Sequence, residues 1–490
     1  MRMKLEALVE KLSNEFFDIE IKLGKRKLRR NLKQRDSMIG AMRYILSKAY
    51  RSEKSTGLHQ FTINHRAGFY SKPDGEVWDL PSYRSVKGAY DFLKDEGYIF
   101  ETKKGFYDRE TGSGETTRSE ATFKLCALLD DVAVSEELFI PALDSGQLIL
   151  KGTKLKEYTP KGKKRVRPAE KISYSQSPEV EKMTENLRVI NNCLLRHWAD
   201  LEIPDIWYKK SDVKSENEWL ESIDFSKRTI TRIFNNGSFE CGGRFYHAWW
   251  QNIPRDLRKH ITIDSKRTVE VDYSQMHPRL LYELTGNDLG EEDAYGRVFA
   301  GQHRDVVKVA FNAMLNAESN LKRKPDGLDI SKTGMTWPQM RKAILDAHRP
   351  IEEYFFCGKG GYLQYLDSQV AERVMLHYAV HDVPVLPVHD SFIVHHSYEF
   401  EIAEVMESIY NEVCRGNAKT KPKKLERPEA SSDIHDFPDM SMEAILHADD
   451  DRLLWVNRNT AWNNWKLEPG NLKKLYVPPT AEAWEATATS

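Results

Sequence analysis

The chain has 490 residues, of which 40% are hydrophobic and 30% are charged, and its formal net charge is −1. This length exceeds one compact core, so two or three domains are expected. The balanced charge excludes a simple polycation, and any affinity for nucleic acid must come from local basic surfaces. The sequence has no apolar run of about 18 residues, so no membrane span is predicted, and its amphipathic N-terminus is unlike a signal peptide.

The five cysteines are scattered, and no two of them form a CxxC pair. This spacing argues against a zinc knuckle and against the disulfide framework of a secreted protein. We therefore expect a cytoplasmic protein. The cysteines are Cys126, Cys193, Cys241, Cys357 and Cys414.

Residues 1–150 are predicted to form an N-terminal domain of helices and strands. Ser37 to Tyr50 and Ser85 to Glu96 are helical in pattern, His59 to Tyr70 is strand-like, and residues 98–110 form a β-ribbon. A helix followed by two strands with a basic tip resembles a winged helix-turn-helix, a DNA-binding arrangement. The alternative is a small α+β domain with solvated lysines. The candidate phosphate contacts are Arg84, Lys87, Lys103, Lys104 and Arg118.

Three further boundaries follow from composition. Residues 151–176 are rich in Lys, Arg, Gly and Pro, which predicts a flexible basic linker, either solvated or touching a nucleic-acid backbone. Residues 177–235 begin with Ser177 as helix N-cap and Pro178 at the first helical position, and we expect a helical, thumb-like region. Residues 236–415 carry the motifs described below. Residues 416–490 are predicted to be a linker and a poorly ordered C-terminal tail.

The first motif-bearing segment runs from Thr268 to Tyr282. Its residues TVEV predict a short strand, in which Glu270 and Asp272 share one face and Asp272 stands at the end. A helix is expected to follow near Pro278. A carboxylate in this position can project into a cleft, although a single aspartate after a strand is usually a helix cap.

The second segment, Val383 to His396, predicts two apolar strands joined by a tight turn at His389-Asp390. Two other His-Asp dipeptides occur in the chain, so the dipeptide alone means little. This one lies between two strands, and a rigid β scaffold suits a metal site better than a loose loop.

The third segment, His303 to Ala317, has four polar residues at intervals of four, which would form one stripe on a helix. An amphipathic surface helix explains such a stripe, and so does a pair of cations that holds a triphosphate. The polar residues are Arg304, Lys308, Asn312 and Asn316.

Together the three segments predict a metal-dependent nucleotidyltransferase. Asp272 and Asp390 would hold two Mg²⁺ ions, with Mn²⁺ as an alternative. Arg304 and Lys308 would neutralise a triphosphate, and Lys308 would protonate the leaving pyrophosphate. This chemistry requires positioning and charge stabilisation, with little covalent work by the protein.

Five motifs between about residues 235 and 400 resemble, in order and spacing, those of family A DNA polymerases of the bacterial polymerase I type. The related phage-type single-subunit RNA polymerases share them. The motifs are Gly243-Arg244, Gln251-Asn252-Ile253-Pro254, Asp272-Tyr273-Ser274-Gln275 with Arg279, Arg304 with Lys308, and His389-Asp390. The stretch from Gln364 to Met375 resembles the family's glutamine-containing palm helix.

The resemblance implies an α+β right-hand polymerase, with an antiparallel palm sheet and helical fingers and thumb, preceded by the winged-helix-like domain. It implies that the Tyr273 carbonyl assists Asp272 and Asp390 as a metal ligand. The implied nucleotide-binding residues are Arg304, Lys308, Tyr273, His277, Asn312 and Asn316. The residues implied to contact the primer-template are Arg244, Gln251, Arg279, His389 and Gln369.

Three departures from the family pattern leave the sugar preference open. The acid that helps DNA polymerases exclude the ribose hydroxyl is replaced by His277. Asn316 occupies the usual aromatic position of the finger helix, and Ser391 follows the second aspartate as in the phage-type RNA polymerases. The finger region is also short, which favours a reduced enzyme. No proofreading exonuclease is predicted.

Several functions therefore remain in competition. The first is a compact DNA polymerase acting on a DNA primer-template or an RNA–DNA hybrid with nucleoside triphosphates. The second is an RNA polymerase or primase, supported by Ser391, His277 and Asn316. The third is a non-catalytic DNA-binding regulator of replication or transcription with a decayed palm. A template-independent terminal transferase is a further alternative. No membrane partner is expected, and the sequence names no protein partner.

Overall fold

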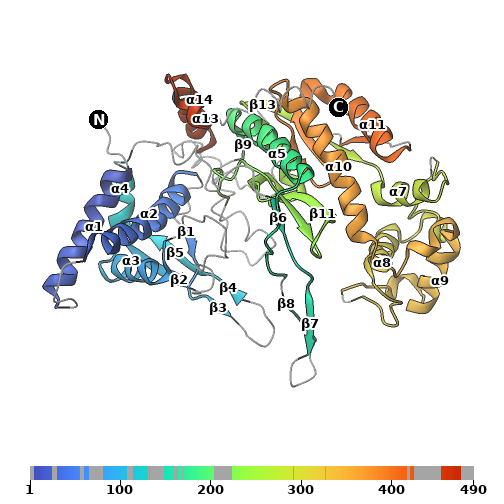
Figure 1. Ribbon diagram of the computed structural model, residues 1–490, viewed down its shortest axis with the longest axis horizontal. Coiled ribbons are helices and arrows are strands. Elements are labelled where there is room, and N and C mark those ends of the chain that lie inside the picture. The colour runs from blue at the N-terminus through green and yellow to red at the C-terminus, as the bar shows by residue number, and fades with distance from the viewer. Residues whose placement is uncertain are drawn as a thin grey trace, which may run out of the picture.

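The protein has a mixed α+β fold, seen in a computed structural model (Figure 1). The structure describes residues 5–475 except 25–29, 56–59, 66–80, 108–113, 131, 133–147, 159–163, 168, 204–222, 291, 326, 417–419 and 424–453. A helical N-terminal unit lies at one side of the view in Figure 1. A larger body, in which helices cover antiparallel strands, lies at the other side.

The N-terminal unit packs helices around a small antiparallel sheet. Its elements are α1 (Leu5–Lys22), α2 (Leu32–Ser55), β1 (Gln60–Ile63), α3 (Tyr83–Asp95), β2 (Ile99–Lys103), β5 (Thr117–Ala121) and α4 (Phe123–Asp130). The sheet order is β1-β5-β2, and β3 (Phe106–Tyr107) pairs with β4 (Gly114–Glu115) beside it. Ser82 caps α3, and Gly97 follows its end with a φ of 72°, which favours glycine. The two predicted helices are confirmed, and part of the predicted strand from His59 to Tyr70 falls outside the described residues.

The predicted basic linker contains regular structure. Just before the linker, at the end of the predicted N-terminal domain, β6 (Leu148–Leu150) pairs in parallel with β10 (Thr231–Asn235) of the larger body. After it, β7 (Leu155–Tyr158) and β8 (Lys164–Arg167) form an antiparallel hairpin that projects from the body in Figure 1. The linker lacks the apolar residues needed for a hydrophobic core of its own, yet its two strands pair with each other.

The larger body is built on a six-stranded antiparallel sheet. Its order is β14-β15-β13-β12-β9, with β16 also paired to β13. A second, three-stranded sheet has the order β11-β10-β6. The strands are β9 (Ala199–Leu201), β11 (Ser238–Tyr246), β12 (Ile261–Ile263), β13 (Lys266–Tyr273), β14 (Leu386–Val388), β15 (Ser391–His395) and β16 (Thr420–Lys423).

Helices cover these strands and share one hydrophobic core with them. The helices are α5 (Pro178–Arg196), α7 (Met276–Leu284), α8 (Arg304–Asn316), α9 (Trp337–Ala347), α10 (Gly360–Ala379) and α11 (Glu399–Cys414). The predicted cap of α5 is confirmed, because the Ser177 side chain accepts a hydrogen bond from the Val180 N–H and Pro178 opens the helix. The long helix α10 packs against β11, α5 and α11.

The region predicted to be linker and tail also contributes to the fold. Besides β16, it supplies α13 (Leu454–Leu467) and α14 (Asn471–Lys474). Arg458 of α13 forms a buried ion pair with Asp200 of β9, at 2.6 Å, and Trp462 stacks on Trp198 with ring centroids 5.6 Å apart. Burial of these rings and of this ion pair attaches α13 to the sheet, so the prediction of a simple tail does not hold for these residues. Residues 476–490 lie outside the described part of the chain.

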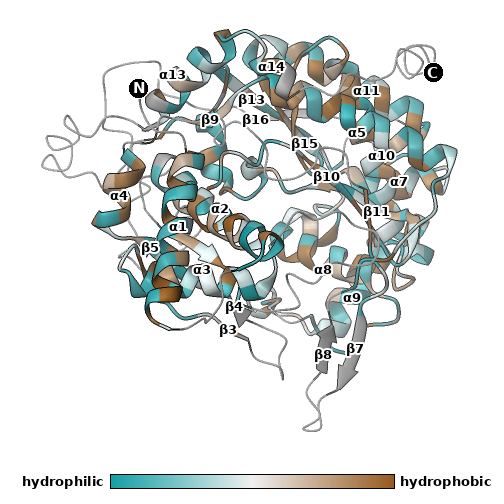
Figure 2. Cartoon of the chain, turned by 60° about the vertical axis from the view of Figure 1, so that its left-hand side comes forward, coloured by the Kyte–Doolittle hydropathy of each residue, from teal (hydrophilic) through white to brown (hydrophobic). Residues whose placement is uncertain are grey.

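The colouring in Figure 2 shows hydrophobic and hydrophilic residues on the same helices of both units, as expected for helices that cover a core. Within the described part of the chain, no helix combines the length and the apolar character needed to cross a bilayer. All five cysteines are described, and all are free thiols.

Candidate active site

Of the two predicted metal-binding aspartates, Asp272 lies near the end of β13, and Asp390 lies in the turn that leads into the neighbouring strand β15. β13 and β15 are antiparallel, and their register places Asp272 opposite Ser391, the residue next to Asp390. The Tyr273 N–H donates a hydrogen bond to the Asp390 carbonyl, with the two atoms 3.2 Å apart. Both aspartates are partly exposed, whereas the strand residues around them are buried. The sheet thus brings Asp272 close to Asp390, although the two residues are 118 positions apart in the sequence (390 − 272).

A two-residue turn presents Asp390. Val388 pairs with Ser391, so His389 and Asp390 alone connect β14 to β15, as the sequence predicts. His389 has a φ of 61°, a conformation that costs a non-glycine residue about 1 kcal/mol or more and is concentrated at functional sites. The His389 ring packs edge-to-face against the Tyr246 ring, with the two ring centroids 5.9 Å apart. Burial lowers the pKa of His389, and the nearby Arg244 guanidinium adds to the effect, so the ring is neutral at neutral pH.

Buried polar groups support this turn from below. The Ser391 hydroxyl donates to the carboxylate of Glu270 at 2.6 Å, and Arg258 lies 3.4 Å from the same oxygen. Glu270 is only 3% exposed, so its charge needs these partners. Ser391, which is paired with Asp272, therefore lies on the same face of the sheet as Asp272 and Glu270, and its hydroxyl is turned toward Glu270.

A second polar cluster joins three elements beside the aspartates. Arg244 of β11 forms a bidentate ion pair with Asp367 of α10, and His277 at the start of α7 contacts the same carboxylate at 2.8 Å. Arg244 also lies 3.2 Å from the His277 ring. Burial opposes the charge on Arg244, but Asp367 and, less strongly, Asp390 raise its pKa above the ordinary value. Arg244 thus carries a fixed positive charge close to Asp390.

Helix α8 carries the predicted cations, and one of them is already paired. Arg304 forms two hydrogen bonds to Asp293, at 2.5 and 3.1 Å. Lys308 is exposed, with its ammonium group 5.9 Å from the centre of the Tyr295 ring. Arg304 lies over the same ring at 5.3 Å. Tyr295 is therefore a buried platform beneath both cations.

Tyr295 also connects α8 electrostatically to the aspartate turn. Burial raises the pKa of its hydroxyl, Arg304 opposes the shift, and the carboxylates of Asp293 and Asp390 add to it. Asn312 interacts with the same hydroxyl. At the end of α8, the Asn316 amide donates to the Asn312 carbonyl at 2.7 Å. Arg304, Lys308 and Asn312 of the predicted polar stripe therefore all lie beside Tyr295, and the pKa of the Tyr295 hydroxyl is also raised by Asp390.

Two residues predicted to touch nucleic acid are engaged with the backbone. The Gln251 amide donates to the carbonyls of Phe245 and Pro387, at 2.9 and 3.1 Å, and thereby links β11 to β14. Arg279 is 4% exposed and donates to the carbonyls of Ser274 and Gly290. Tyr273 is buried too, and its hydroxyl donates to the Met406 carbonyl at 2.5 Å. In the structure these side chains brace the site.

Gln369 lies elsewhere on α10. It lines a groove of about 990 Å³ between α5, α10 and α11, together with residues such as Met183 and Leu376. Asp367, two residues earlier, faces Arg244 on the other side of the helix. Two positions on a helix differ by about 200° in direction, so Gln369 and Asp367 cannot share one face.

Three residues of this site are not predicted from the sequence, namely Asp293, Tyr295 and Asp367. Asp293 and Tyr295 belong to a segment without helical or strand periodicity. Asp367 lies on a predicted helix, but its burial depends on Arg244, 123 positions away. The sequence signal that points to Asp367 is a carboxylate at a position of the helix where an apolar residue is expected.

The donor set suits a hard divalent cation. Carboxylate oxygens are the type of ligand that Mg²⁺ prefers, and the partial exposure of both aspartates leaves room for water and phosphate oxygens. Arg244, Arg304 and Lys308 supply positive charge around them. A phosphate-containing substrate is the class of ligand that matches this arrangement.

Comparison with known proteins adds little to this geometry. No protein-family model matches the chain, and no curated protein matches it. Among solved structures, the chain is similar to the POL domain of Pol1 from M. smegmatis in complex with DNA primer-template and dNTP, with a TM-score of 0.29 and 14% sequence identity. The match covers 40% of this chain and 46% of the other, so the chain spans less than half of that protein's length.

Proposed function

We propose that the protein is a template-directed nucleotidyltransferase, in the form of a compact DNA polymerase with a palm and reduced fingers. The observation that carries this proposal is the β13–β15 register, which brings Asp272 next to the His389-Asp390 turn. Two carboxylates on a rigid strand and the adjoining turn, with cations on a facing helix, are what phosphoryl transfer requires.

Asp272 and Asp390 would hold the Mg²⁺ ions, and the Tyr273 carbonyl would assist. Bound there, a pair of Mg²⁺ ions would activate the attacking 3′-hydroxyl and stabilise the leaving pyrophosphate. The backbone hydrogen bond between Tyr273 and Asp390 fixes the spacing of the two strands at this point. The buried Ser391–Glu270 contact keeps the turn from shifting when charge accumulates above it.

The finger helix would bind the incoming nucleotide. Lys308 is exposed and available to a phosphate, whereas Arg304 must exchange Asp293 for the triphosphate. Tyr295 would hold both cations at the level of Asp390. Lys308 would then donate a proton to the pyrophosphate as it leaves.

The primer-template would lie along the palm, beside Arg244 and His389. Arg244 retains its charge while paired with Asp367, and the neutral His389 can donate or accept a hydrogen bond. Gln251 and Arg279 would act by holding the strands and α7 in place, through the backbone bonds described above. A primer-template contact by Gln369 would require nucleic acid to reach the groove beside α5.

The N-terminal unit would guide the enzyme to DNA. The strand order β1-β5-β2 next to α3 supports a winged-helix arrangement. Lys103 and Lys104, at the end of β2, are exposed on the ribbon. Lys87 is also exposed but is paired with Asp91 at 2.5 Å, so it would contact phosphate only after leaving this partner.

RNA synthesis remains the second candidate, and one observation favours it. His277 presents an imidazole at the position where the family A DNA polymerases that the sequence resembles carry an acid. The Asp367 carboxylate lies 2.8 Å from that ring, however, so a negative charge is retained at this place. We therefore expect the His277–Asp367 pair to determine whether the enzyme prefers deoxyribonucleotides or ribonucleotides.

Primer extension with Mg²⁺ tests the proposal. The full chain is incubated with a labelled primer on a DNA template and with dNTPs or NTPs, and a primer without template is the control for terminal transfer. We expect template-dependent extension, more of it with dNTPs, and a loss of at least 100-fold in Asp390→Asn. The matched control is Asp346→Asn, an exposed aspartate on α9. Extension that is equal in wild type and Asp390→Asn would overturn the proposal.

A further inference from the structure

A second group of metal-ligating side chains lies at the other end of the palm sheet. Cys193 and His197 stand one turn apart at the end of α5, and Asp382 lies in the turn between α10 and β14. Their ligand atoms all lie within 4.8 Å of one another. The adjacent β12–β13 turn is separated from Asp272 by the length of β13, roughly 25 Å at about 3.3 Å per residue. The group is therefore distinct from the site at Asp272 and Asp390.

We propose that Cys193, His197 and Asp382 form a zinc site that links the C-terminal end of α5 to the turn before β14. A thiolate, an imidazole and a carboxylate are the ligands that Zn²⁺ takes, and together with one solvent ligand they complete a tetrahedron. The two negative charges of this set balance the Zn²⁺ charge. Mg²⁺ disfavours sulfur and nitrogen ligands, so this cluster and the Asp272–Asp390 site select different metals.

The spacing of the donor atoms agrees with such a site. His197 Nε2 and Asp382 Oδ1 are 3.3 Å apart. Nitrogen and oxygen ligands at about 2.0–2.1 Å from a tetrahedral zinc ion are about 3.4 Å from each other. The spacing of His197 and Asp382 therefore matches that of two ligands of one zinc ion, and the Cys193 sulfur lies within 4.8 Å of both.

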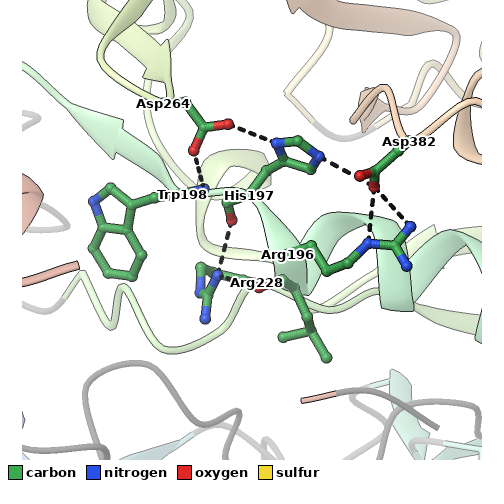
Figure 3. A network of polar contacts seen from close by, with 7 residues as sticks. Arg196, His197, Trp198, Arg228, Asp264 and Asp382 are labelled. Atoms are coloured by element: carbon green, nitrogen blue, oxygen red, sulfur yellow. Dashed lines mark hydrogen bonds and ion pairs between the residues drawn. The ribbon is translucent and has the colours of Figure 1, made fainter. Parts of the chain in front are cut away.

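A supporting carboxylate orients the histidine, as Figure 3 shows. His197 Nδ1 lies 2.6 Å from Asp264, and Asp264 also accepts the Trp198 N–H at 3.0 Å. Asp264 and Ser265 both have positive φ, 49° and 61°, in the tight turn that joins β12 to β13. Metal-binding histidines commonly carry a carboxylate on the nitrogen that does not bind the metal. This contact leaves Nε2 directed toward Asp382.

Three features oppose metal binding and define its requirements. Burial lowers the pKa of His197, but its hydrogen bonds to Asp264 and Asp382 outweigh burial and raise it, so the ion must displace a proton from Nε2. Burial raises the pKa of the Cys193 thiol to about 12, so the ion must displace a proton from it. Arg196 is paired with Asp382 Oδ1 at 2.6 Å, so it must share or release this carboxylate (Figure 3). The Asp382 side chain is 55% exposed, which allows that exchange and gives the ion access from solvent. Zinc occupancy should accordingly fall as the pH is lowered.

Titration of the metal-free full chain tests this site. Zn²⁺ is added in competition with a chromophoric chelator, and Co²⁺ is used separately as a spectroscopic probe of thiolate ligation. Both experiments use an Asp272→Asn/Asp390→Asn background, so that the proposed catalytic site does not take up the probe. We expect one tight Zn²⁺ per chain and a near-ultraviolet thiolate-to-cobalt band.

Single variants then assign the ligands. Cys193→Ser and Asp382→Asn should weaken Zn²⁺ binding at least 100-fold, and Asp264→Asn should weaken it about 10- to 100-fold. The control Cys414→Ser, which removes a partly buried cysteine outside the proposed zinc site, should bind like the parent. Asp382 is exposed, so its variant tests the site even if Cys193→Ser fails to fold. Absence of the thiolate band, or unchanged affinity in Asp382→Asn, would overturn the proposal.

Discussion

At the scale of single residues, Asp293 occupies the guanidinium of Arg304, the group that the proposed function assigns to the nucleotide phosphate. It holds Arg304 through two hydrogen bonds, yet the arginine side chain is 45% exposed. An exposed ion pair of this kind contributes on the order of 0.5 kcal/mol, so a triphosphate can displace it. Asp293 would thus keep the cation extended over Tyr295 until substrate arrives.

Replacement of Asp293 by Asn should therefore improve nucleotide binding. Loss of the competing carboxylate predicts a KM for the incoming nucleotide about 2- to 5-fold lower, with little change in kcat. Steady-state primer extension at varied nucleotide concentration measures both constants, and Asp346→Asn is the matched control. A KM that rises in Asp293→Asn would mean that the aspartate orients Arg304 for the phosphate and does not compete with it.

The residues of the site differ in how far the sequence could predict them. The period-two pattern before Asp272 and the two apolar runs around His389-Asp390 predicted both strands and the turn, because neighbouring residues alone determine those patterns. Asp293 and Tyr295 could not be predicted in this way. They lie before a stretch in which Phe299, Ala300 and His303 have positive φ, a path that no simple periodicity encodes.

At the scale of elements, α13 shows what a long-range contact adds. Its sequence follows a polar segment that composition assigns to a linker, and the prediction of a tail came from that composition. The helix is held by Arg458 on Asp200, a partner 258 positions away, and by Trp462 on Trp198. Periodicity within α13 carries no information about these partners, so its docking could not be predicted from the sequence.

The Arg458–Asp200 pair gives a stability prediction for this element. Both side chains are essentially buried, at 1% and 0% exposure, so Arg458→Met would leave a buried carboxylate without its cation. We expect a loss of about 3–5 kcal/mol in the free energy of unfolding, measured with urea. The double variant Arg458→Met/Asp200→Asn should recover most of the loss. Equal stability of Arg458→Met and wild type would show that α13 does not dock as described.

At the scale of the whole molecule, His197 makes stability depend on pH. Burial lowers its pKa, but the carboxylates of Asp264 and Asp382 outweigh burial, and the net pKa is raised above 6.5. A pKa that is higher in the folded state contributes stability that is fully present below pH about 6.5 and is lost as the pH rises through the folded value.

The metal-free protein should therefore lose stability as the pH rises above about 6.5, in a way that depends on this histidine. Urea unfolding at a series of pH values, in the presence of a chelator, measures the effect. In His197→Asn the difference from wild type should shrink as the pH rises. A difference that stays constant across this range would mean that His197 is neutral in the folded protein.

In the proposed function, Asp272 and Asp390 act as one catalytic unit, although they come from distant parts of the chain. Single-turnover primer extension by Asp272→Asn, Asp390→Asn and the double variant tests it most directly. If both aspartates hold the same ions, each single variant should lose nearly as much activity as the double variant, because either loss disables the unit. Single losses that multiply in the double variant, or a single variant that keeps wild-type activity, would contradict this claim.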